Sequence, residues 1–540
     1  MYKRIALPMG LLVSTCITTS ITAQQKRETP NIIVILADDL GYSDLGCYGS
    51  EIQTPNIDML ASQGLRMTHM YNCSRSCPSR AALLTGLYPH KAGIGAMTDW
   101  TIDNTQGYKG YLTKHSVTIA QALKQNDYNT YISGKWHVGD NPENFPLQRG
   151  FDRFFGIVIG ACSYFNPRPY RIFSKVGVYN DSSVYKTPND FYMTQAITDN
   201  ALQYLNMQKN SQNPFFLYMA YTAPHWPLHA LPEDIELFRG KYMVGWDSIR
   251  ERRYRKQEEL GILAKNYQLS PKYNKHIPMW DTLSYKDKVY YDLKMATYAA
   301  MIFRMDKGIG KLVEKLKEIG EYDNTLIIFL SDNGGCSEMM NWQKMNMDLV
   351  GTDASFDSYD YAGANVSNTP YRMFKHWLHE GGISTPFIAW YPAVIKANTI
   401  RTDIAHITDV MPTILHITKI KYPKTYENNT LYSLPGKSLL PVFEGKLFKG
   451  QKFLAWEHFG ARALRYGEWK IVTLSDTDPW ELYNMEDDPC ELNNLASKLP
   501  KKITKLEKIY KNWATQNFVI PFKLADEMYK KQLEQNKNEN

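Results

Sequence analysis

Two stretches of similar form point to the fold. Residues 31–41, Asn-Ile-Ile-Val-Ile-Leu-Ala-Asp-Asp-Leu-Gly, join an apolar run to two aspartates, and residues 326–335, Leu-Ile-Ile-Phe-Leu-Ser-Asp-Asn-Gly-Gly, repeat this arrangement. Short apolar runs bounded by turn residues are typical of buried strands. Ligands of an open α/β sheet bind beyond the carboxyl ends of its strands. The two endings therefore predict a site at that edge.

The side chains at these strand ends are hard oxygen donors. Asp38 and Asp39 follow the first run, and Asp332 and Asn333 follow the second. Three carboxylates and one amide oxygen suit Ca²⁺ or Mg²⁺, whereas zinc sites use His and Cys. Each motif alone is also a common turn. The pattern is therefore compatible with a metal site and also with two turns that merely cap the strands.

The rest of the chain alternates strand-like and helical segments, which predicts an α/β fold. Further strands are expected at 128–133, 215–220 and 386–390, and helices at 117–124, 296–319 and 408–417. The polar, aromatic segment 231–286 reads as an excursion from the core. After residue 445, short strands at 454–456, 461–466 and 469–474 and a basic helix predict a smaller α+β subdomain.

Composition excludes several classes of protein. The 540 residues are 44% hydrophobic and 22% charged, which rules out a disordered, collagenous or coiled-coil chain. The net charge of +7 is mild. Basic residues gather at 498–537 together with acidic ones, which favours a solvated helical face over a nucleic-acid surface.

The N-terminus has the pattern of a signal peptide. Lys3 and Arg4 precede an apolar run, and small and polar residues follow to Ala23, so we expect cleavage after residue 23 and export. The run is too short to span a membrane. Cys16 is a weak rival site for lipid attachment because Thr15 is a poor residue before it. Six cysteines would remain, too few for a disulfide framework in so long a chain.

The run Ser76-Cys77-Pro78-Ser79-Arg80 predicts the start of a helix, which Gly86 can end. Ser76 would then lie just before a helix N-terminus, where unpaired amides favour an anion. Arg80, one turn along, adds donors matched to a tetrahedral oxyanion. A short capped helix with a surface arginine is the alternative.

This run matches the signature of the type I, formylglycine-dependent sulfatases. The chain resembles that family from Asn31 to about Asn494, and within it the bacterial arylsulfatases, on the strength of residues 92–97, 298–306 and 480–484. The resemblance implies an alkaline-phosphatase-like fold, with a large mixed sheet flanked by helices. It also implies a catalytic domain at 24–445 and a C-terminal subdomain with a small antiparallel sheet at 446–540.

The resemblance also implies the site. Ser76 stands where Cys is commoner and would be converted to formylglycine. Ca²⁺ would be held by Asp38, Asp39, Asp332, Asn333 and the modified Ser76. The other catalytic residues would be Arg80, Lys135, His137, His225 and Lys375.

Three of these matches have plainer explanations. If the strand before Lys135 continues, Lys135 and His137 share one face, but such a pair is usually exposed polar surface. His225 could simply pack under Trp226.

The implied activity is hydrolysis of aryl sulfates or sulfated glycans. A Ser-type enzyme would be matured by an anaerobic, radical-based enzyme of bacteria, which places it in the periplasm or outside the cell. The four sequons, at Asn72, Asn180, Asn365 and Asn428, would then be unused. The rim of the substrate pocket is expected from 231–286, 339–369 and the region around His458.

Two other functions stay open. One is a phosphate or phosphonate monoester hydrolase of the same superfamily, although no second Asp and His cluster suggests a two-metal centre. The other is a catalytically silent protein that binds sulfated glycans.

Overall fold

The structure is a computed structural model that describes residues 29–167, 177–209, 211–273, 276–340 and 345–538. The predicted signal peptide, residues 1–23 with Cys16, lies outside the described residues. No helix in the described part of the chain is long and apolar enough to cross a membrane.

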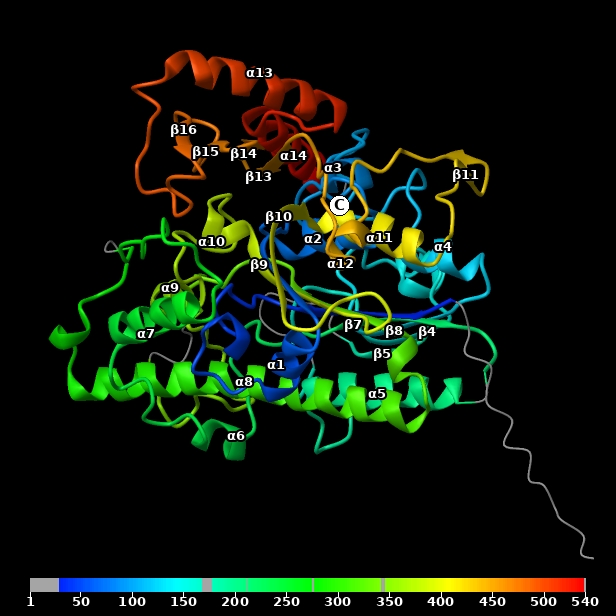
Figure 1. Cartoon of the computed structure of the whole chain (residues 1–540), viewed down its shortest axis with the longest axis horizontal. Helices are drawn as coiled ribbons and strands as arrows, with labels where there is room; N and C mark the ends of the chain where they lie inside the picture. The colour runs from blue at the N-terminus through cyan, green and yellow to red at the C-terminus, as the bar shows by residue number, and fades with distance from the viewer. Residues whose placement is uncertain (1–28, 168–176, 210, 274–275, 341–344, 539–540) are drawn as a thin grey trace, which may run out of the picture.

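A large mixed sheet forms the centre of the molecule (Figure 1). In the described ranges its strands lie in the order β10-β2-β9-β8-β1-β7-β3-β4-β5-β6. They are β1 (Asn31–Ala37), β2 (Leu65–Tyr71), β3 (Asn129–Lys135), β4 (Arg153–Ile157), β5 (Tyr179–Asn180), β6 (Ser183–Val184), β7 (Phe215–Ala220), β8 (Thr325–Ser331), β9 (Ser384–Trp390) and β10 (Thr399–His406). β1 lies between β7 and β8 and runs parallel to both, so the three strands end at the same edge.

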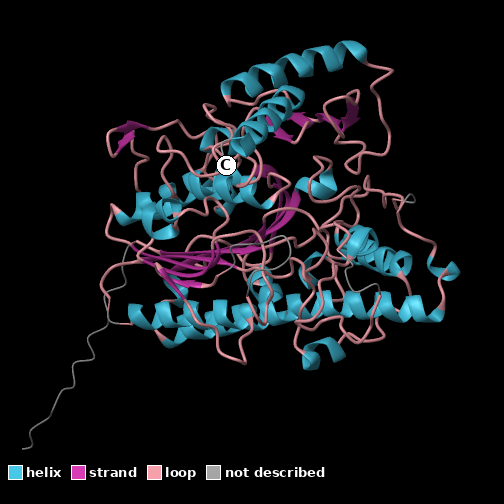
Figure 2. Ribbon diagram, turned by 180° about the vertical axis from the view of Figure 1, so that it is seen from behind, coloured by secondary structure: helices cyan, strands magenta, loops and turns pink. Residues whose placement is uncertain are grey.

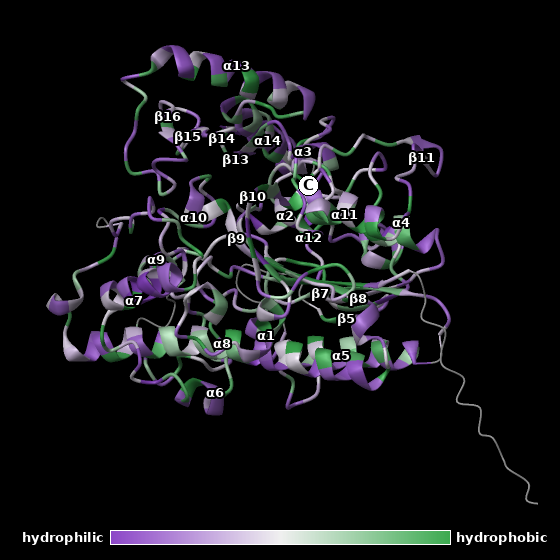
Figure 3. Cartoon of the chain, in the orientation of Figure 1, coloured by the Kyte–Doolittle hydropathy of each residue, from purple (hydrophilic) through white to green (hydrophobic). Residues whose placement is uncertain are grey.

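The side chains of β1 alternate between two apolar layers because successive residues of a strand face opposite sides. Ile33 and Ile35 pack into one layer, and Val34 and Leu36 into the other. The predominantly apolar strands are the green centre of Figure 3. A strand buried on both faces reads as a continuous apolar run, which is why the sequence of β1 identified it.

Helices cover both faces of the sheet (Figure 2). One layer contains residues of α1 (Pro55–Ser62), α5 (Met193–Gln208), α6 (Pro232–Glu236), α7 (Trp246–Glu259), α8 (Tyr285–Glu318) and α9 (Asp360–Ser367). The other contains residues of α2 (Ser76–Thr85), α3 (Pro89–Ala92), α4 (Ile119–Lys124), α11 (Val410–Ile417) and α12 (Leu440–Phe443). The short helix α10 (Glu380–Ile383) precedes β9. The predicted α/β fold with a large mixed sheet is confirmed.

Several elements were missed from the sequence, among them the strands β2 and β10 and the first turns of α8. β2 carries Arg66, Thr68 and His69 among its apolar residues, and most of the edge strand β10 is only half-buried. Neither gives a clean apolar run. α8 begins at Tyr285, well before the predicted start at 296. The sequence did not reveal its first turns because they are largely polar. The Ser284 hydroxyl caps these turns by accepting a hydrogen bond from the Asp287 amide.

A small antiparallel sheet follows near the C-terminus. It consists of β13 (Leu454–His458), β14 (Ala461–Tyr466), β15 (Trp469–Thr473) and β16 (Glu481–Asn484), and a separate hairpin of β11 (Thr425–Tyr426) and β12 (Asn429–Thr430) precedes it. One face of the sheet packs on Tyr71, Leu378 and Ile383 of the catalytic part. The other face carries α13 (Pro500–Gln516), and α14 (Phe522–Asn538) completes the chain. The boundary at residue 445 stays a prediction.

A buried ion network joins this small sheet to the catalytic part. The Lys470 ammonium lies 2.7 Å from a carboxylate oxygen of Glu380 and 2.7 Å from one of Glu491, and all three side chains are buried. The Tyr71 hydroxyl donates to Glu380 at 2.9 Å. Since Glu380 begins α10, the network fixes the chain directly after the loop that carries Lys375.

The six cysteines that would remain after removal of residues 1–23 are free and buried. Two of the four sequon asparagines, Asn72 and Asn365, are also buried. Those two side chains are not accessible to a glycosyl group in the folded protein.

Asp306 of α8 provides a test of how the helices are held together. Its carboxylate accepts hydrogen bonds from the backbone amides of Asn56 and Ile57, at 3.1 and 2.8 Å, and so caps the first turn of α1. Asp306→Ala leaves those donors buried without a partner, so we expect the free energy of unfolding to fall by about 2 kcal/mol. Urea denaturation followed by circular dichroism measures this.

The matched control is Asp323→Ala, which removes an exposed carboxylate and should change stability by less than about 0.5 kcal/mol. Equal urea midpoints for the two variants would contradict the capping role of Asp306.

Candidate active site

The predicted oxygen donors meet at the carboxyl edge of the sheet. Asp38 and Asp39 follow β1, and Asp332 and Asn333 follow β8. The Asp39 amide donates to Asp332 Oδ1 at 3.2 Å, and Asn333 Nδ2 donates to Asp39 Oδ1 at 2.7 Å. All four side chains are buried. The structure therefore brings together residues almost 300 positions apart.

Ser76 is the first residue of α2, not the residue before it as the sequence predicted. Its Oγ lies 2.8 Å from Asp38 Oδ1 and 2.7 Å from Asp332 Oδ2. A hydroxyl has one proton and can donate to only one carboxylate at a time. Ser76 Oγ, Asp38 Oδ1 and Asp332 Oδ2 therefore lie close together, an arrangement that a shared proton or a bound cation would stabilise.

Two cations neutralise these carboxylates. Lys135 Nζ lies 2.6 Å from Asp38 Oδ2 and Arg80 Nη2 lies 2.9 Å from Asp332 Oδ2, with no exposed side-chain surface on any of the four. Burial raises the pKa of Asp38, but the neighbouring cations, Lys135 foremost, outweigh it and hold the pKa at about 2. Burial and the Asp38 charge raise the pKa of Asp332. Asp38 is thus an ionised partner for cations.

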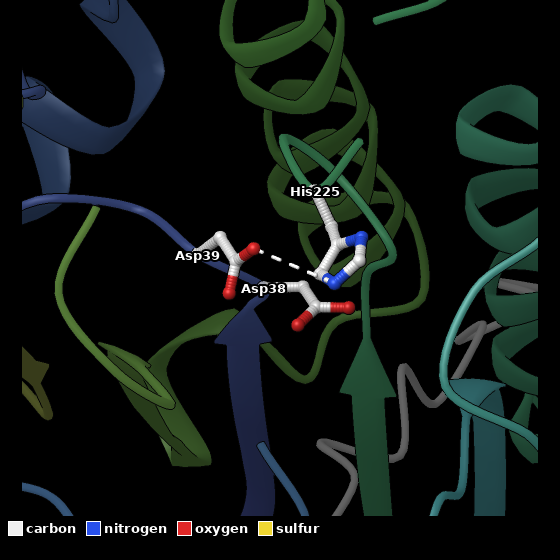
Figure 4. Close-up of side chains that lie close together, drawn as sticks. All are labelled: Asp38, Asp39 and His225. Atoms are coloured by element: carbon white, nitrogen blue, oxygen red, sulfur yellow. Dashed lines mark ion pairs between the residues drawn. The ribbon is translucent and has the colours of Figure 1, made fainter. Parts of the chain in front are cut away.

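Lys375 and His225 form a second group around Asp39. Lys375 Nζ lies 2.9 Å from Asp39 Oδ2 and 3.3 Å from His225 Nε2, and His225 Nε2 lies 3.5 Å from Asp39 Oδ2. Figure 4 shows Asp38 and Asp39 at the end of β1 with His225 facing them from the loop after β7. His225 also contacts the Trp226 ring, at 4.4 Å between centroids. His225 therefore both packs beside Trp226 and faces the site.

Lys375 reaches this position because two glycine segments touch. The Gly334 amide donates to the Gly382 carbonyl at 3.0 Å, and a Cβ on Gly334 would come within 1.9 Å of the Gly381 carbonyl oxygen. Any larger residue at 334 would therefore push α10, and the Lys375 loop before it, away from Asn333.

His137 lies near the same groups but beyond the end of strand β3. β3 ends at Lys135, and His137 has a φ of 55°, so the extended geometry that would place both side chains on one face does not continue. His137 Nε2 is 3.1 Å from Cys77 Sγ, and its buried Nδ1 has no partner among the described residues. Burial, then Lys135 and Arg80, lower the pKa of His137, which keeps it neutral.

These groups open into a cleft of about 490 Å³. Ser76, Lys135, His137, His225 and Lys375 all line it. Its walls come from segments that the sequence did not single out, around Thr98, Asp140 and Gly160.

The predicted rim was mostly wrong. The described residues of segment 231–286 do not line the cleft, because α7 packs Trp246 and Ile249 into the apolar layer beneath the sheet. His458 is fully buried. From the described part of 339–369, Met340 lines the cleft.

Glu338 is a site residue that sequence reasoning missed. Its carboxylate accepts from Arg75 Nη1 at 2.8 Å and from Trp226 Nε1 at 2.8 Å, and lies 3.5 Å from Lys375 Nζ. Its side chain is 28% exposed and lines the cleft. Burial raises the pKa of Glu338, but Lys375 and Arg75 outweigh it and hold the pKa well below its usual range. No motif marks Glu338 in the sequence, and only folding places it beside Arg75, Trp226 and Lys375.

The donor set fits a hard cation. Asn333 Oδ1 is buried and has no hydrogen-bond partner among the described residues, which leaves an oxygen lone pair for a metal. Asp38, Asp39 and His225 are also close enough to share an ion. Calcium prefers oxygen to imidazole, so we favour the carboxylates and Asn333 over His225 as ligands.

Charges at the centre balance. Asp38, Asp39 and Asp332 are matched by the three cations Arg80, Lys135 and Lys375. A bound divalent ion would leave a surplus of positive charge, and a site with such a surplus favours an anion. The fold and this site together define an enzyme-like centre for an anionic ligand at the carboxyl edge of a mixed α/β sheet.

Comparison with known proteins identifies the family. The model of the family described as Sulfatase matches residues 30–420, and the chain belongs to that family. It is therefore an enzyme that hydrolyses sulfate esters. A second model, for the C-terminal part of N-sulphoglucosamine sulphohydrolase, matches residues 371–515.

Two relatives cover most of the chain. An uncharacterized sulfatase of Schizosaccharomyces pombe is 33% identical over 517 residues, which are 89% of this chain and 93% of the relative. An arylsulfatase of Klebsiella aerogenes is 36% identical over 444 residues, 78% of this chain and 94% of the relative. The solved structure of Ps i-CgsB in complex with k-i-k-neocarrahexaose has a TM-score of 0.67 at 29% identity, covering 91% of this chain and 93% of its own.

Glu338→Gln tests whether Glu338 positions the catalytic groups. An amide has one acceptor oxygen and no charge, so it cannot hold Arg75, Trp226 and Lys375 together as the carboxylate does. We expect kcat for 4-nitrophenyl sulfate to fall about 10- to 100-fold, with less change in KM and an unchanged melting temperature.

Glu338→Asp keeps the charge and should recover part of kcat. The control Glu236→Gln, at an exposed glutamate of α6, should leave kcat unchanged. Wild-type kcat in Glu338→Gln would show that the contacts of Glu338 do not matter for turnover.

Proposed function

We propose that the protein hydrolyses sulfate esters through a formylglycine residue made from Ser76. The position of Ser76 supports this most strongly. Its Oγ lies at the start of a buried helix, between Asp38 and Asp332 and 3.4 Å from Lys135 Nζ. The contacts hold the side chain where an anionic ester meets the helix N-terminus and the cations.

Modification is needed because a serine hydroxyl is a weak nucleophile without a base. Hydrated formylglycine supplies two hydroxyls on one carbon, one to attack sulfur and one whose ionisation releases the sulfate. Lys135 would hold the attacking oxygen and a sulfate oxygen. Arg80 would fix Asp332 and stabilise negative charge as it develops on the sulfate.

Ca²⁺ would be held by Asp38, Asp39, Asp332 and Asn333 together with the modified Ser76. When bound, it would supply positive charge that lowers the pKa of a ligated hydroxyl and stabilises the sulfate oxygens. Burial raises the pKa of Asp38 and of Asp39, but the neighbouring cations outweigh it and lower both, which keeps these two carboxylates ionised for this purpose.

His225 and Lys375 lie together on one side of the site and would serve the leaving group. As the ester S–O bond breaks, the alcohol or phenol oxygen needs a proton, which either side chain could donate. His137, which burial keeps neutral, would act as the base that takes the proton of the second hydroxyl. The sulfate then leaves and the aldehyde of formylglycine forms again.

The substrate would be an aryl sulfate or a sulfated glycan. Relatives named as arylsulfatase and as N-acetylglucosamine-6-O-sulfatase support both classes. We further propose that an anaerobic maturase converts Ser76 and that residues 1–23 direct export to the periplasm or medium. Residues 24–445 would form the catalytic domain and residues 446–540 the C-terminal subdomain.

Mass spectrometry of the peptide across Ser76 tests the central step. Protein co-expressed with an anaerobic sulfatase maturase should lack one hydrogen pair at residue 76 relative to serine, and Ser76→Ala should have no sulfatase activity. An unmodified Ser76 in that protein would point instead to a serine-dependent phosphoester hydrolase or a binding protein, and full sulfatase activity in Ser76→Ala would remove Ser76 from the mechanism. Tight binding of a sulfated glycan without turnover, with Ser76 unconverted even after co-expression with the maturase, would point to a binding protein.

Removal of calcium tests the metal site. Treatment with EGTA should abolish turnover of 4-nitrophenyl sulfate, and added Ca²⁺ should restore it. Asn333→Ala removes one ligand oxygen, so we expect it to raise the Ca²⁺ concentration for half-maximal activity about tenfold or more. Calcium should also raise the melting temperature of the wild type more than that of the variant.

Asn206→Ala, at an exposed position of α5 on the far side of the sheet, is the control and should behave as the wild type. An unchanged calcium response in Asn333→Ala would remove Asn333 from the ligand set.

A further inference from the structure

A second hollow opens beside the reaction cleft. It has a volume of about 260 Å³ and shares two wall residues, Thr98 and Asp140, with the cleft of about 490 Å³. The two hollows are therefore adjacent, and a group attached to an ester in the cleft would reach the second hollow past Thr98 and Asp140. The hollow contains none of the residues assigned to catalysis or metal binding.

Polar side chains without internal partners line this hollow. They include three amides, one hydroxyl and two carboxylates: Asn104, Asn141, Asn144, Thr101, Asp103 and Asp140. Within the described residues none of these side chains forms a hydrogen bond or ion pair with another. Such a concentration of free donors and acceptors is typical of a surface that binds a polyhydroxylated ligand through hydrogen bonds.

The charge of the hollow selects among such ligands. Asp103 and Asp140 outnumber Lys109, its one lysine. A second sulfate would be repelled here, whereas the catalytic centre next to it attracts one. Ile102 and Tyr108 in the wall are buried, and Tyr111 is the aromatic ring of the wall that is exposed, so a ligand here meets one aromatic face among polar side chains. A neutral sugar ring carries no charge to be repelled and presents hydroxyls to the polar side chains, so it suits this hollow.

The hollow is held open by structure far away in the chain. The Asp103 amide donates to Gln532 of α14 at 2.8 Å, and the Trp100 ring packs on Tyr529 at 4.8 Å between centroids. On the opposite wall Gly139 has a φ of 133°, and a Cβ there would lie 2.7 Å from the Cβ of Asn144. Two separate walls are thus fixed before a ligand binds, which lowers the entropic cost of binding.

We propose that this hollow is a binding subsite for an unsulfated sugar linked to the sulfated sugar in the reaction cleft. The proposal rests on the sulfatase function proposed above and extends it, because it makes an oligosaccharide, and not a small aryl sulfate, the preferred substrate. The volume of the hollow is below that of pockets for drug-sized ligands, so it accommodates one ring.

Matched substrates test the subsite. Galactose sulfate and N-acetylglucosamine 6-sulfate are each offered alone and linked to one unsulfated sugar, with 4-nitrophenyl sulfate as a reference that cannot fill the hollow. For at least one sugar, kcat/KM should be about tenfold higher for the disaccharide. Asn104→Ala combined with Asn141→Ala should abolish that gain, since each lost hydrogen bond weakens binding several-fold, and should leave turnover of 4-nitrophenyl sulfate unchanged.

Asn206→Ala on α5 is the matched control and should keep the gain. A binding readout accompanies the kinetics: the Ser76→Ala protein, studied by titration calorimetry, should bind the preferred disaccharide about tenfold more tightly than the monosaccharide. Equal constants for the two, or a gain that survives the double variant, would overturn the subsite. Absence of turnover of every sulfate ester offered, sugar and aryl alike, in wild-type protein with converted Ser76 would instead overturn the proposed function.

Discussion

Three buried carboxylates have to be neutralised where β1 and β8 end, and the rest of the site follows from this requirement. Asp38, Asp39 and Asp332 have almost no exposure, and an unpaired charge at such a depth costs several kcal/mol. Lys135, Arg80 and Lys375 supply the opposite charges from β3, α2 and the loop before α10. The electrostatic centre therefore forms only when segments from across the chain have assembled.

The same pairing serves the chemistry. Cations that neutralise the carboxylates in the folded chain are also the groups that would contact a sulfate when a divalent ion takes over the carboxylates. Ser76 lies at the meeting point, at the N-terminus of a helix buried on all sides. Stability and the proposed anion binding would thus depend on one set of side chains, and variants of these residues would affect both.

The C-terminal elements shape the site without supplying the proposed reacting groups. Lys470 binds Glu380 directly after the Lys375 loop, and α14 supports the wall that contains Asp103. A small sheet and two helices placed late in the chain therefore set the geometry of residues that precede them by 90 to more than 400 positions.

Local signals in the sequence determined the central strands, the start of α2 and the oxygen donors after β1 and β8. These features depend on neighbouring residues: a doubly buried strand needs a continuous apolar run, and a strand end needs a turn. Tertiary structure alone decided the role of Glu338, the walls around Thr98 and Asp140, and the path of β2 and β10. Those depend on contacts between distant segments, which leave no periodicity or motif in any one stretch of chain.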